Sequence, residues 1–205
     1  MAGARTDGRV ERGNQTRRLV LGRTMAIASV EGLDGLSIGR IASELGLSKS
    51  GVFALFGSKE ELQLATIRAA RAVFADQVAR PAAEEPPGLG RVRRLCEAFL
   101  AYSRSRVFPG GCFFTSVSAE FSARSGPVRD AVAAARTEWV GHVRELVEEA
   151  RRAGELRADL DVPQLAFELT ALLEMANNDS ALHADDAGYG RAAAGISARL
   201  AAAAA

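Results

Sequence analysis

Residue types that build metal sites, disulfide frameworks and catalytic centres are scarce in this chain. Its 205 residues include two cysteines, Cys96 and Cys112, and two histidines, His142 and His183. Neither pair has the spacing of metal ligands, and two cysteines make no disulfide framework. The run Gly88-Leu89-Gly90 lacks the third glycine and the preceding strand of a phosphate-binding loop. We therefore expect no bound metal, no cofactor and no catalytic residue.

Long uncharged apolar runs are also missing. None approaches the roughly 20 residues that a membrane-spanning helix needs. The first residues, MAGARTDGRVERG, contain no apolar segment like that of a secretory signal. We expect a cytoplasmic protein with no membrane partner. Hydrophobic residues make up 48% of the chain, which is ample for a buried core.

Charge of one sign does not dominate the chain either. The formal net charge is +1, which excludes a polycation that coats nucleic acid through bulk electrostatics. The distribution is uneven, however, because six arginines fall within the first 23 residues, against Asp7 and Glu11. Such a basic N-terminal segment favours nucleic acid as a partner. We expect residues 1–13 themselves to form a disordered arm.

What the sequence does contain is a succession of apolar residues at the helical period, with no convincing strand alternation. This pattern predicts an all-helical protein. Residues 81–90, which include Glu84-Glu85-Pro86-Pro87, are predicted to be a loop. The predicted helices span about 14–30, 37–45, 49–56, 59–80, 89–107, 111–123, 127–153, 162–182 and 189–205.

Capping signals support several of these boundaries. The predicted N-caps are Ser37, Ser48 and Asp161. Ser58 and Glu61 match a capping box, in which each side chain bonds to the other residue's backbone N–H. Glycines that supply the left-handed backbone at helix ends are Gly32, Gly46 and Gly154.

The segment from Ser37 to Phe56 has the arrangement of a helix-turn-helix, with Gly46 in the turn. In that motif the first helix braces the second, whose N-terminal side chains reach base edges in the major groove. The second helix, 49–56, is too short to be stable by itself. The alternative interpretation is an αα-corner inside an ordinary helical bundle.

The two faces of helix 49–56 differ in the way this motif requires. Val52 and Phe56 lie four residues apart and suit packing on the first helix. Gly51 is unfavourable in a helix by about 1 kcal/mol relative to alanine, which fits a close approach of the backbone to DNA. The residues left for the DNA side are Lys49, Ser50, Gly51 and Ala54.

The run SIGRIASELGLSKSGVFALFGSKEEL resembles the DNA-binding domain of the TetR (tetracycline repressor) family of bacterial regulators. The resemblance covers about residues 16–62 and implies a helix-turn-helix DNA-binding domain over 14–62, which binds a palindromic operator. By resemblance, Lys59 at the positive N-terminus of the next helix meets a phosphate. The DNA-binding residues that it implies are Arg17, Ser37, Arg40, Ser48, Lys49, Ser50, Gly51, Phe53 and Lys59.

Two positions depart from the family pattern. Phe53 stands where the family most often has tyrosine, so no hydroxyl is available there for a phosphate contact. Leu55 stands where histidine or tyrosine is frequent. Both changes indicate an interface with fewer polar contacts or a different half-site.

The resemblance also implies that residues 63–205 form a helical ligand-binding and dimerisation domain. The family's members are homodimers that leave their operators when a small molecule binds, so we expect a repressor of this kind. Few ionisable groups lie among the candidate cavity residues, which favours an apolar or aromatic effector. Those candidates are Phe99, Tyr102, Cys112, Phe113, Val117, Phe121, Trp139, Val143 and Met175.

Two features of the last helices bear on assembly. Asn177-Asn178-Asp179-Ser180 interrupts an otherwise apolar helix, and we expect this helix to emerge into solvent there. In the final helix, Ile196 and Leu200 lie four residues apart among alanines, which permit close helix approach. With the helix over 162–182, it is expected to form a four-helix seam between two subunits.

Cys112 carries the alternative functions. It lies near a predicted helix start, where the helix dipole lowers a thiol pKa. Redox sensing or a thiol enzyme are therefore alternatives to an inert apolar side chain. The remaining alternative function is that of a structural helical adaptor, which would have no salt-dependent affinity for DNA.

Overall fold

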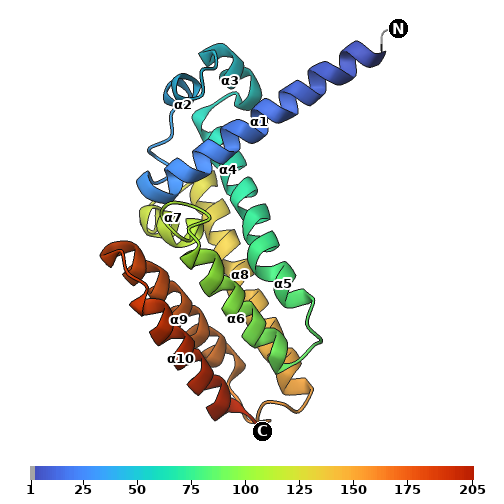
Figure 1. The fold of residues 1–205 in the computed structure, drawn as a ribbon, viewed down its shortest axis with the longest axis vertical. Coiled ribbons are helices and arrows are strands. Elements are labelled where there is room, and N and C mark those ends of the chain that lie inside the picture. The colour runs from blue at the N-terminus through green and yellow to red at the C-terminus, as the bar shows by residue number, and fades with distance from the viewer. Residues whose placement is uncertain (1–2) are drawn as a thin grey trace.

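The computed structural model describes residues 3–205, and within them it contains helices and no strand, apart from one isolated bridge between Leu156 and Ala204. The prediction of an all-helical protein is confirmed. Figure 1 shows α1 to α3 as a small unit at one end, from which α4 leads into a bundle with α6, α8, α9 and α10. The helices are α1 (Gly3–Glu31), α2 (Ile38–Glu44), α3 (Lys49–Phe56), α4 (Lys59–Phe74), the π-helical turn η1 (Ala75–Ala79), α5 (Arg80–Ala83), α6 (Leu89–Arg104), α7 (Phe113–Phe121), α8 (Pro127–Arg152), α9 (Val162–His183) and α10 (Ala187–Ala203).

The caps of the small N-terminal unit form as predicted. The hydroxyl oxygens of Ser37 and Ser48 accept hydrogen bonds from the backbone N–H groups of Arg40 and Gly51. Gly46 ends the first of the two helices with a φ of 64°. These bonds satisfy N–H groups that a helix start leaves without partners. Each cap fixes where its helix begins, and Gly46 lies in the predicted turn between α2 and α3.

The start of α4 has one half of the predicted capping box. Ser58 accepts from the Glu61 N–H at 3.0 Å. The Glu61 carboxylate instead lies 3.9 Å from a guanidinium nitrogen of Arg68, about two helical turns further on. The reciprocal bond of the box is therefore not among the hydrogen bonds of the described residues.

The first helix begins earlier than predicted. α1 starts at Gly3, so the expected disordered arm is wrong for residues 3–13, while residues 1–2 lie outside the described part of the chain. Apolar periodicity reports only the residues that pack on a core. A helix can continue beyond its packed face where its residues, as arginine does, have adequate helix propensity.

The helix that follows Lys59 also extends further than predicted. Instead of stopping before Pro81, the chain continues through the π-helical turn η1 into α5. In that wider turn the Arg80 N–H reaches the Ala75 carbonyl, five residues back. The proline then lies in the first turn of α5, where its missing N–H is tolerated.

α7 lies where the small unit meets the bundle, and it contacts α1 as well as α8 and α9. It begins at Phe113 rather than at the predicted Gly111, because Gly111 has a φ of 84°. α6 likewise ends at Arg104, before the left-handed Arg106. The bends on both sides of the α6–α7 loop give this short helix its own direction between the two parts of the molecule.

Candidate functional site

The exposed face of α3 carries the residues expected to face DNA. Val52 and Phe56 are 1% and 6% exposed and pack into the core of the small unit, as their spacing predicts. Phe53, by contrast, is 53% exposed, an unusual position for a large aromatic side chain. The exposed residues of α3 are Lys49, Ser50, Gly51, Phe53 and Ala54.

Gly51 lies next to the N-cap of α3. A Cβ at this position would lie 2.8 Å from Ser48 Oγ, the atom that accepts the Gly51 N–H. The same serine cap accommodates Arg40 in α2 and Glu61 in α4, so the cap alone does not require glycine here. The close approach of the Gly51 backbone to DNA stays a prediction.

Arg40 is held by acidic side chains of its own domain. Its guanidinium donates to both Glu31 carboxylate oxygens, at 2.5 and 2.7 Å, and to Glu44 at 2.8 Å. Arg23 donates to the other Glu44 oxygen at 2.6 Å. The hydrogen bond from Arg40 lowers the pKa of Glu31, and those from Arg23 and Arg40 lower the pKa of Glu44. Any contact of Arg40 with a phosphate would compete with these carboxylates.

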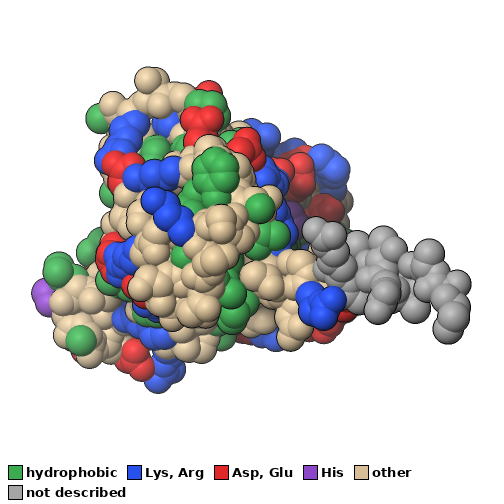
Figure 2. Space-filling view, turned by 90° about the horizontal axis from the view of Figure 1, so that it is seen from above, with side chains coloured by type: hydrophobic (Ala, Val, Ile, Leu, Met, Phe, Trp, Pro, Cys, Tyr) green, Lys and Arg blue, Asp and Glu red, His purple; other side chains and the backbone are tan. Residues whose placement is uncertain are grey.

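Figure 2 looks at the end of the molecule that carries α2 and α3. Lysine and arginine side chains are spread over this face together with acidic and apolar ones, and they do not form one continuous basic patch. A contact with DNA would therefore depend on individual cations of α3 and α4 rather than on the net charge of this end.

Arg17 supports α3 from α1. Its guanidinium donates to the Leu55 carbonyl at 2.8 Å and lies over the Phe56 ring, 4.6 Å from the centroid. Both contacts are made with the C-terminal half of α3, and they fix the orientation of this helix against α1. A role of Arg17 in DNA binding stays a prediction. Its contacts with Leu55 and Phe56 give it a structural role in addition.

Lys59 is exposed at the start of α4 and is bonded within the protein. Its Nζ donates to the Asp34 carbonyl at 2.7 Å and lies 3.5 Å from the Asp34 carboxylate. Asp34 belongs to the loop between α1 and α2. The candidate phosphate-binding amine is therefore linked directly to this loop.

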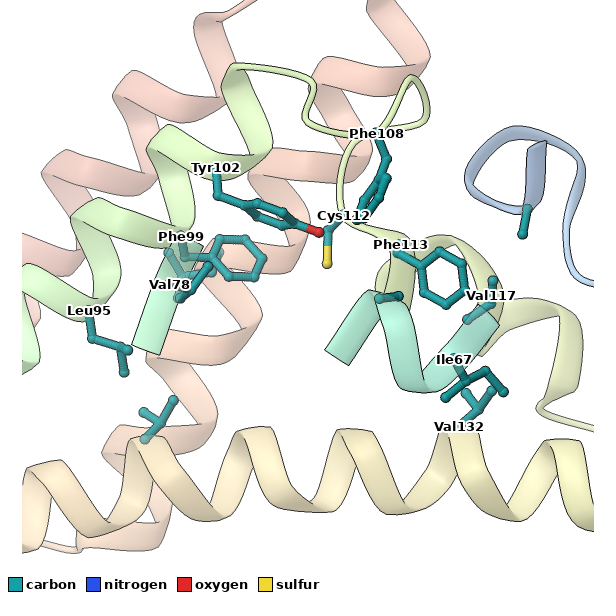
Figure 3. Close-up of a cluster of buried hydrophobic side chains, with 14 of the residues drawn as sticks. Ile67, Val78, Leu95, Phe99, Tyr102, Phe108, Cys112, Phe113, Val117 and Val132 are labelled. Atoms are coloured by element: carbon teal, nitrogen blue, oxygen red, sulfur yellow. The ribbon is translucent and has the colours of Figure 1, made fainter. Parts of the chain in front are cut away.

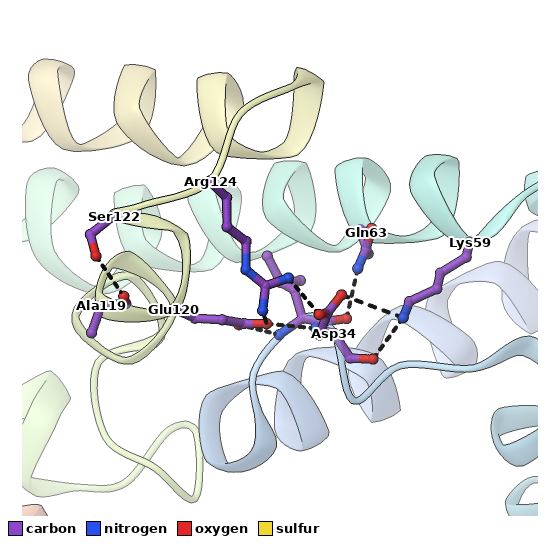
Figure 4. Close-up of polar contacts among 8 residues, drawn as sticks. Asp34, Lys59, Gln63, Ala119, Glu120, Ser122 and Arg124 are labelled. Atoms are coloured by element: carbon purple, nitrogen blue, oxygen red, sulfur yellow. Dashed lines mark hydrogen bonds and ion pairs between the residues drawn. The ribbon is translucent and has the colours of Figure 1, made fainter.

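The same loop is held from the other side by α7, and we call this set of contacts the α7 clamp (Figure 4). The Glu120 carboxylate accepts from the backbone N–H groups of Leu33 and Asp34, at 2.8 and 2.9 Å. Arg124 donates to the Asp34 carboxylate at 2.5 Å, and this bond is the main cause that lowers the Asp34 pKa. The Gln63 amide, from α4, donates to the Leu33 carbonyl at 2.8 Å.

Two glycines permit this close junction. Gly32 has a φ of 79°, and a Cβ there would lie 2.4 Å from the Glu120 carboxylate. A Cβ on Gly110, in the α6–α7 loop, would lie 1.8 Å from the Ser29 carbonyl oxygen of α1. The Gly110 N–H also donates to Ser29 Oγ at 3.1 Å. The α7 segment is thus joined to the end of the molecule that carries α1 to α3 by close contacts at two glycines, which leave no room for a side chain.

A cavity of about 520 Å³ lies in the bundle. Its size suits a small organic molecule. Aromatic rings form much of the wall: Trp139 stacks on Phe99 at a centroid distance of 5.6 Å and meets Phe74 edge-on at 5.0 Å. The lining residues are Arg68, Arg71, Ala72, Phe74, Ala75, Ala79, Phe99, Cys112, Phe114, Thr115, Ala135, Arg136, Glu138, Trp139, His142 and Glu174.

Three of the nine predicted cavity residues lie on this wall: Phe99, Cys112 and Trp139. The other six do not line this cavity. Met175 is 58% exposed, on the outer face of α9. The remaining five are packed in the core because their helix faces point to other helices, namely Tyr102, Phe113, Val117, Phe121 and Val143. The cavity wall contains more ionisable groups than the predicted set, since arginine and glutamate pairs border it.

Cys112 lies in a buried polar junction. Its backbone N–H donates to Asn177 Oδ1 at 2.7 Å, and the same oxygen accepts from Ser103 Oγ at 2.7 Å. Asn177 is 1% exposed, so the expectation that α9 emerges into solvent at this residue is wrong. The amide is buried because it satisfies a backbone donor of the α6–α7 loop and a hydroxyl of α6.

The thiol of Cys112 is buried, and Tyr102 points toward it (Figure 3). Burial raises the pKa of the Cys112 thiol, and it raises that of Cys96 to about 12. Because the thiolate is the reactive form, both thiols are poor nucleophiles in this fold. The alternatives of redox sensing and thiol catalysis lose their physical support.

The clamp residues Asp34, Glu120 and Arg124 did not emerge from the sequence, and neither did the polar cavity residues Arg136, His142 and Glu174. These residues show no distinctive spacing in the sequence, because the partners in each contact come from segments far apart in the chain. Within the described residues, no three or more acidic, cysteine or histidine side chains cluster as metal ligands would. None of the helices described is long and apolar enough to span a membrane.

Comparison with family models identifies both parts of the chain. Residues 20–66 match the model for bacterial regulatory proteins of the tetR family, and residues 88–196 match that for the tetracyclin repressor-like C-terminal domain. The second match alone covers more than half of the chain. No curated protein gives a significant match.

Solved structures extend this similarity to nearly the whole chain. A TetR transcriptional regulator from Chloroflexus aurantiacus shares 26% identity over 95% of this chain and 98% of its own, with a TM-score of 0.85. A putative regulator from Saccharomonospora viridis, solved with choline, has 23% identity over 90% and 94% of the chains and a TM-score of 0.72. AibR, in complex with isovaleryl coenzyme A and operator DNA, has 19% identity over 79% and 85%, with a TM-score of 0.64.

Proposed function

Since this chain belongs to the TetR family of DNA-binding transcriptional regulators, we propose that it is a homodimeric repressor that a small molecule releases from a palindromic operator. The observation that carries this proposal is that α7 takes part in two places. Residues at its start, Cys112, Phe114 and Thr115, border the cavity, and Glu120 in its last turn belongs to the α7 clamp. An occupant of the cavity can therefore act on the DNA-binding end through one short rigid helix.

On the DNA side, each subunit inserts α3 into a major groove. Lys49 and Ser50 at its exposed N-terminal end reach base edges, as in other helix-turn-helix proteins. Ser37, Ser48 and Gly51 bring backbone and hydroxyl groups of the two helix starts toward phosphates. Lys59 contributes a phosphate contact from α4 once its amine turns from the Asp34 carbonyl.

Two subunits pair through α9 and α10. α9 presents apolar side chains to solvent in this single chain, with Phe167 66%, Met175 58% and Leu182 79% exposed. These residues recur every seven or eight positions, so they share one helix face. Exposed alanines of α10 beside it allow a close helix approach. A second copy covering this face would form a four-helix seam with two-fold symmetry.

Release follows from competition between two arrangements of the junction. The α7 clamp holds the α1–α2 loop, and this loop carries the carbonyl that binds Lys59. A molecule that displaces Phe114 or Thr115 moves α7 and, with it, the loop. The spacing or tilt of α3 in the two subunits then no longer matches the operator half-sites. The effector needs different affinities for the two arrangements to shift this equilibrium.

Binding of a small molecule is consistent with two proteins of similar fold, one solved with choline and one with isovaleryl coenzyme A and operator DNA. Those two ligands differ widely in size and charge. Hence the identity of the effector has to be argued from this chain's own cavity, in which Phe74, Phe99, Phe114 and Trp139 form the apolar part of the wall. An apolar or aromatic molecule fits such a wall best. No step of this function requires catalysis.

The test is a selection from random double-stranded DNA with the purified full chain, repeated at low and moderate salt. Recovery of an inverted repeat supports a dimeric sequence-specific regulator. Binding without a motif, lost as salt rises, would contradict it and indicate a non-specific DNA binder. The recovered repeat, with a scrambled duplex as control, then serves to screen apolar and aromatic compounds for release. A compound that increases operator affinity would contradict the proposed release.

A further inference from the structure

The carboxylate of Asp34 lies between two cations that come from different segments (Figure 4). Arg124, in the loop after α7, donates to Oδ2 at 2.5 Å, and Nζ of Lys59, at the start of α4, lies 3.5 Å from Oδ1. Within residues 3–205 these are the two ion pairs of Asp34. All three side chains are about half exposed, so a phosphate can reach the lysine amine from solvent.

The two cations are not held by the carboxylate to the same extent. The hydrogen bond from Arg124 is the main cause that lowers the Asp34 pKa, and Lys59 contributes less. The short bond of Lys59 goes instead to the Asp34 carbonyl, at 2.7 Å. Because Arg124 already neutralises the carboxylate, Lys59 is held chiefly through an uncharged oxygen. A phosphate, which carries a full negative charge, can compete for the amine under these conditions.

The position of Arg124 depends on the end of α7. Its guanidinium lies over the ring of Phe121, the last residue of this helix, 5.0 Å from the centroid, and 3.9 Å from the Glu120 carboxylate. Glu120 also holds the backbone N–H of Asp34. A displacement of this end of α7 would therefore withdraw Arg124 from Asp34. Of the two ion-pair partners described, Lys59 would then be the one left to the carboxylate.

We propose that Asp34 is a positioning residue for DNA binding. While Arg124 neutralises the Asp34 carboxylate, Lys59 is available to a phosphate; when Arg124 withdraws, the carboxylate retains Lys59. Arg124 thereby strengthens DNA binding without touching DNA. This inference rests on the proposed function, because it takes Lys59 as a phosphate contact, and it adds the two residues on which that contact depends.

Two single variants test the proposal in the full chain. Arg124→Gln leaves the Asp34 carboxylate to Lys59 and should lower the affinity for any duplex by about 1.5- to 5-fold, the range that an exposed ion pair supports. It should also reduce the slope of log affinity against log salt by about 1, as loss of one phosphate contact does. Asp34→Asn retains the backbone carbonyl but removes the competing charge, so its affinity should equal or exceed that of the unaltered protein.

Combined variants show whether these effects pass through the same atoms. Beside Asp34→Asn, Arg124→Gln should cost no affinity and should leave the salt slope unchanged. Beside Lys59→Ala, neither Asp34→Asn nor Arg124→Gln should alter affinity. A direct contact of Arg124 with a phosphate predicts the opposite result, namely the same loss in every background. Fluorescence anisotropy at several salt concentrations measures each combination, with a duplex of arbitrary sequence and with the operator obtained by selection.

The matched control is the exposed ion pair of Arg80 with Asp76, at 2.6 Å in α5 and η1, away from α2 and α3. Arg80→Gln and Asp76→Asn change the net charge by the same amounts and should leave DNA affinity near that of the unaltered protein. Thermal unfolding followed by circular dichroism checks that every variant folds. Together, these controls separate the proposed effect from general charge repulsion and from loss of structure.

Each outcome decides the question. An unchanged affinity in Arg124→Gln, a loss that persists beside Asp34→Asn, or a gain of Asp34→Asn that persists beside Lys59→Ala would overturn the inference, even if an inverted repeat is recovered and the proposed function holds. The expected pattern on a duplex of arbitrary sequence, without recovery of an inverted repeat, would support the inference and contradict the sequence-specific regulator. Absence of binding to any duplex would contradict both.

Discussion

Oε2 of Glu120 lies 2.8 Å from the backbone nitrogen of Leu33, which is 87 residues earlier in the chain. This hydrogen bond joins the last turn of α7 to the loop that leads into the helix-turn-helix. The other carboxylate oxygen holds the next N–H, that of Asp34. One side chain thus satisfies two backbone donors at the boundary between the two parts of the molecule.

Removal of this carboxylate should destabilise the protein. In Glu120→Ala, the N–H groups of Leu33, which is buried, and of Asp34 lose their acceptor, which costs about 1–3 kcal/mol of unfolding free energy. Glu120→Gln keeps one acceptor oxygen and should lose less. Urea unfolding followed by circular dichroism measures the change. The matched control is Glu97→Ala, whose side chain is 68% exposed and 3.8 Å from Arg94. A loss in Glu120→Ala no larger than in the control would show that the clamp contributes nothing.

Lys59→Ala should weaken DNA binding to all sequences by a similar factor. One phosphate contact fewer reduces the slope of log affinity against log salt by about 1. Fluorescence anisotropy with the selected operator and a scrambled duplex at several salt concentrations measures both quantities.

Lys49→Ala is the informative comparison for Lys59→Ala, because Lys49 lies on the exposed face of α3. It should reduce the preference for the operator over scrambled DNA as well as the affinity. An unchanged salt slope in Lys59→Ala would mean that its amine stays on Asp34 when DNA binds.

Phe53→Tyr should increase affinity for DNA. The ring is 53% exposed on α3, and a phenol hydroxyl there can donate to a phosphate. A net hydrogen bond of about 0.5–1.5 kcal/mol corresponds to an affinity gain of about 2- to 10-fold. The gain should be similar for operator and scrambled duplexes, as anisotropy titrations will show. Phe53→Leu, which has no hydroxyl, serves as the control, and an equal change in both variants would rule out the phosphate contact.

A charge on the outer face of α9 should dissociate the dimer. In Met175→Asp a carboxylate replaces a side chain that is 58% exposed in the single chain and covered in the proposed seam. Burying an unpaired charge is strongly unfavourable, so the dimer dissociation constant should rise at least about tenfold. Sedimentation equilibrium measures it. Val30→Asp, at a 65% exposed position on α1, should leave the dimer intact; equal dissociation of both variants would place the interface elsewhere.

Both thiols should resist alkylation in the folded protein. Their raised pKa values keep Cys96 and Cys112 protonated as pH rises through the ordinary thiol value of 9.0, so the reactive thiolate stays rare. Iodoacetamide should therefore modify neither residue at neutral or mildly alkaline pH, and both rapidly in urea, as followed by mass spectrometry. Cys112→Ser and Cys96→Ser assign each signal. Fast labelling of Cys112 in the native state, or peroxide-induced release from DNA that Cys112→Ser abolishes, would revive the redox alternative.

The sequence by itself determined the helical class, the helix-turn-helix and most helix boundaries. These features depend on atoms close together in the chain. Ser37 and Ser48 bond to N–H groups three residues away, and Gly46 adopts its left-handed backbone without help from distant residues. The spacing of Val52 and Phe56 likewise reports one helix face. The family resemblance followed from the same local pattern and is now supported over both parts of the chain.

Only the tertiary structure decided which side chains form the cavity and which join α7 to the α1–α2 loop. Phe113 and Phe114 are neighbours in the sequence, yet the first is fully buried in the core and the second borders the cavity. Glu120 and Asp34 look like ordinary surface acids until the fold brings their segments together. Helical periodicity identifies an inward face, but it contains no information about what that face meets. This is determined by the packing of segments far apart in the chain, which no local spacing records.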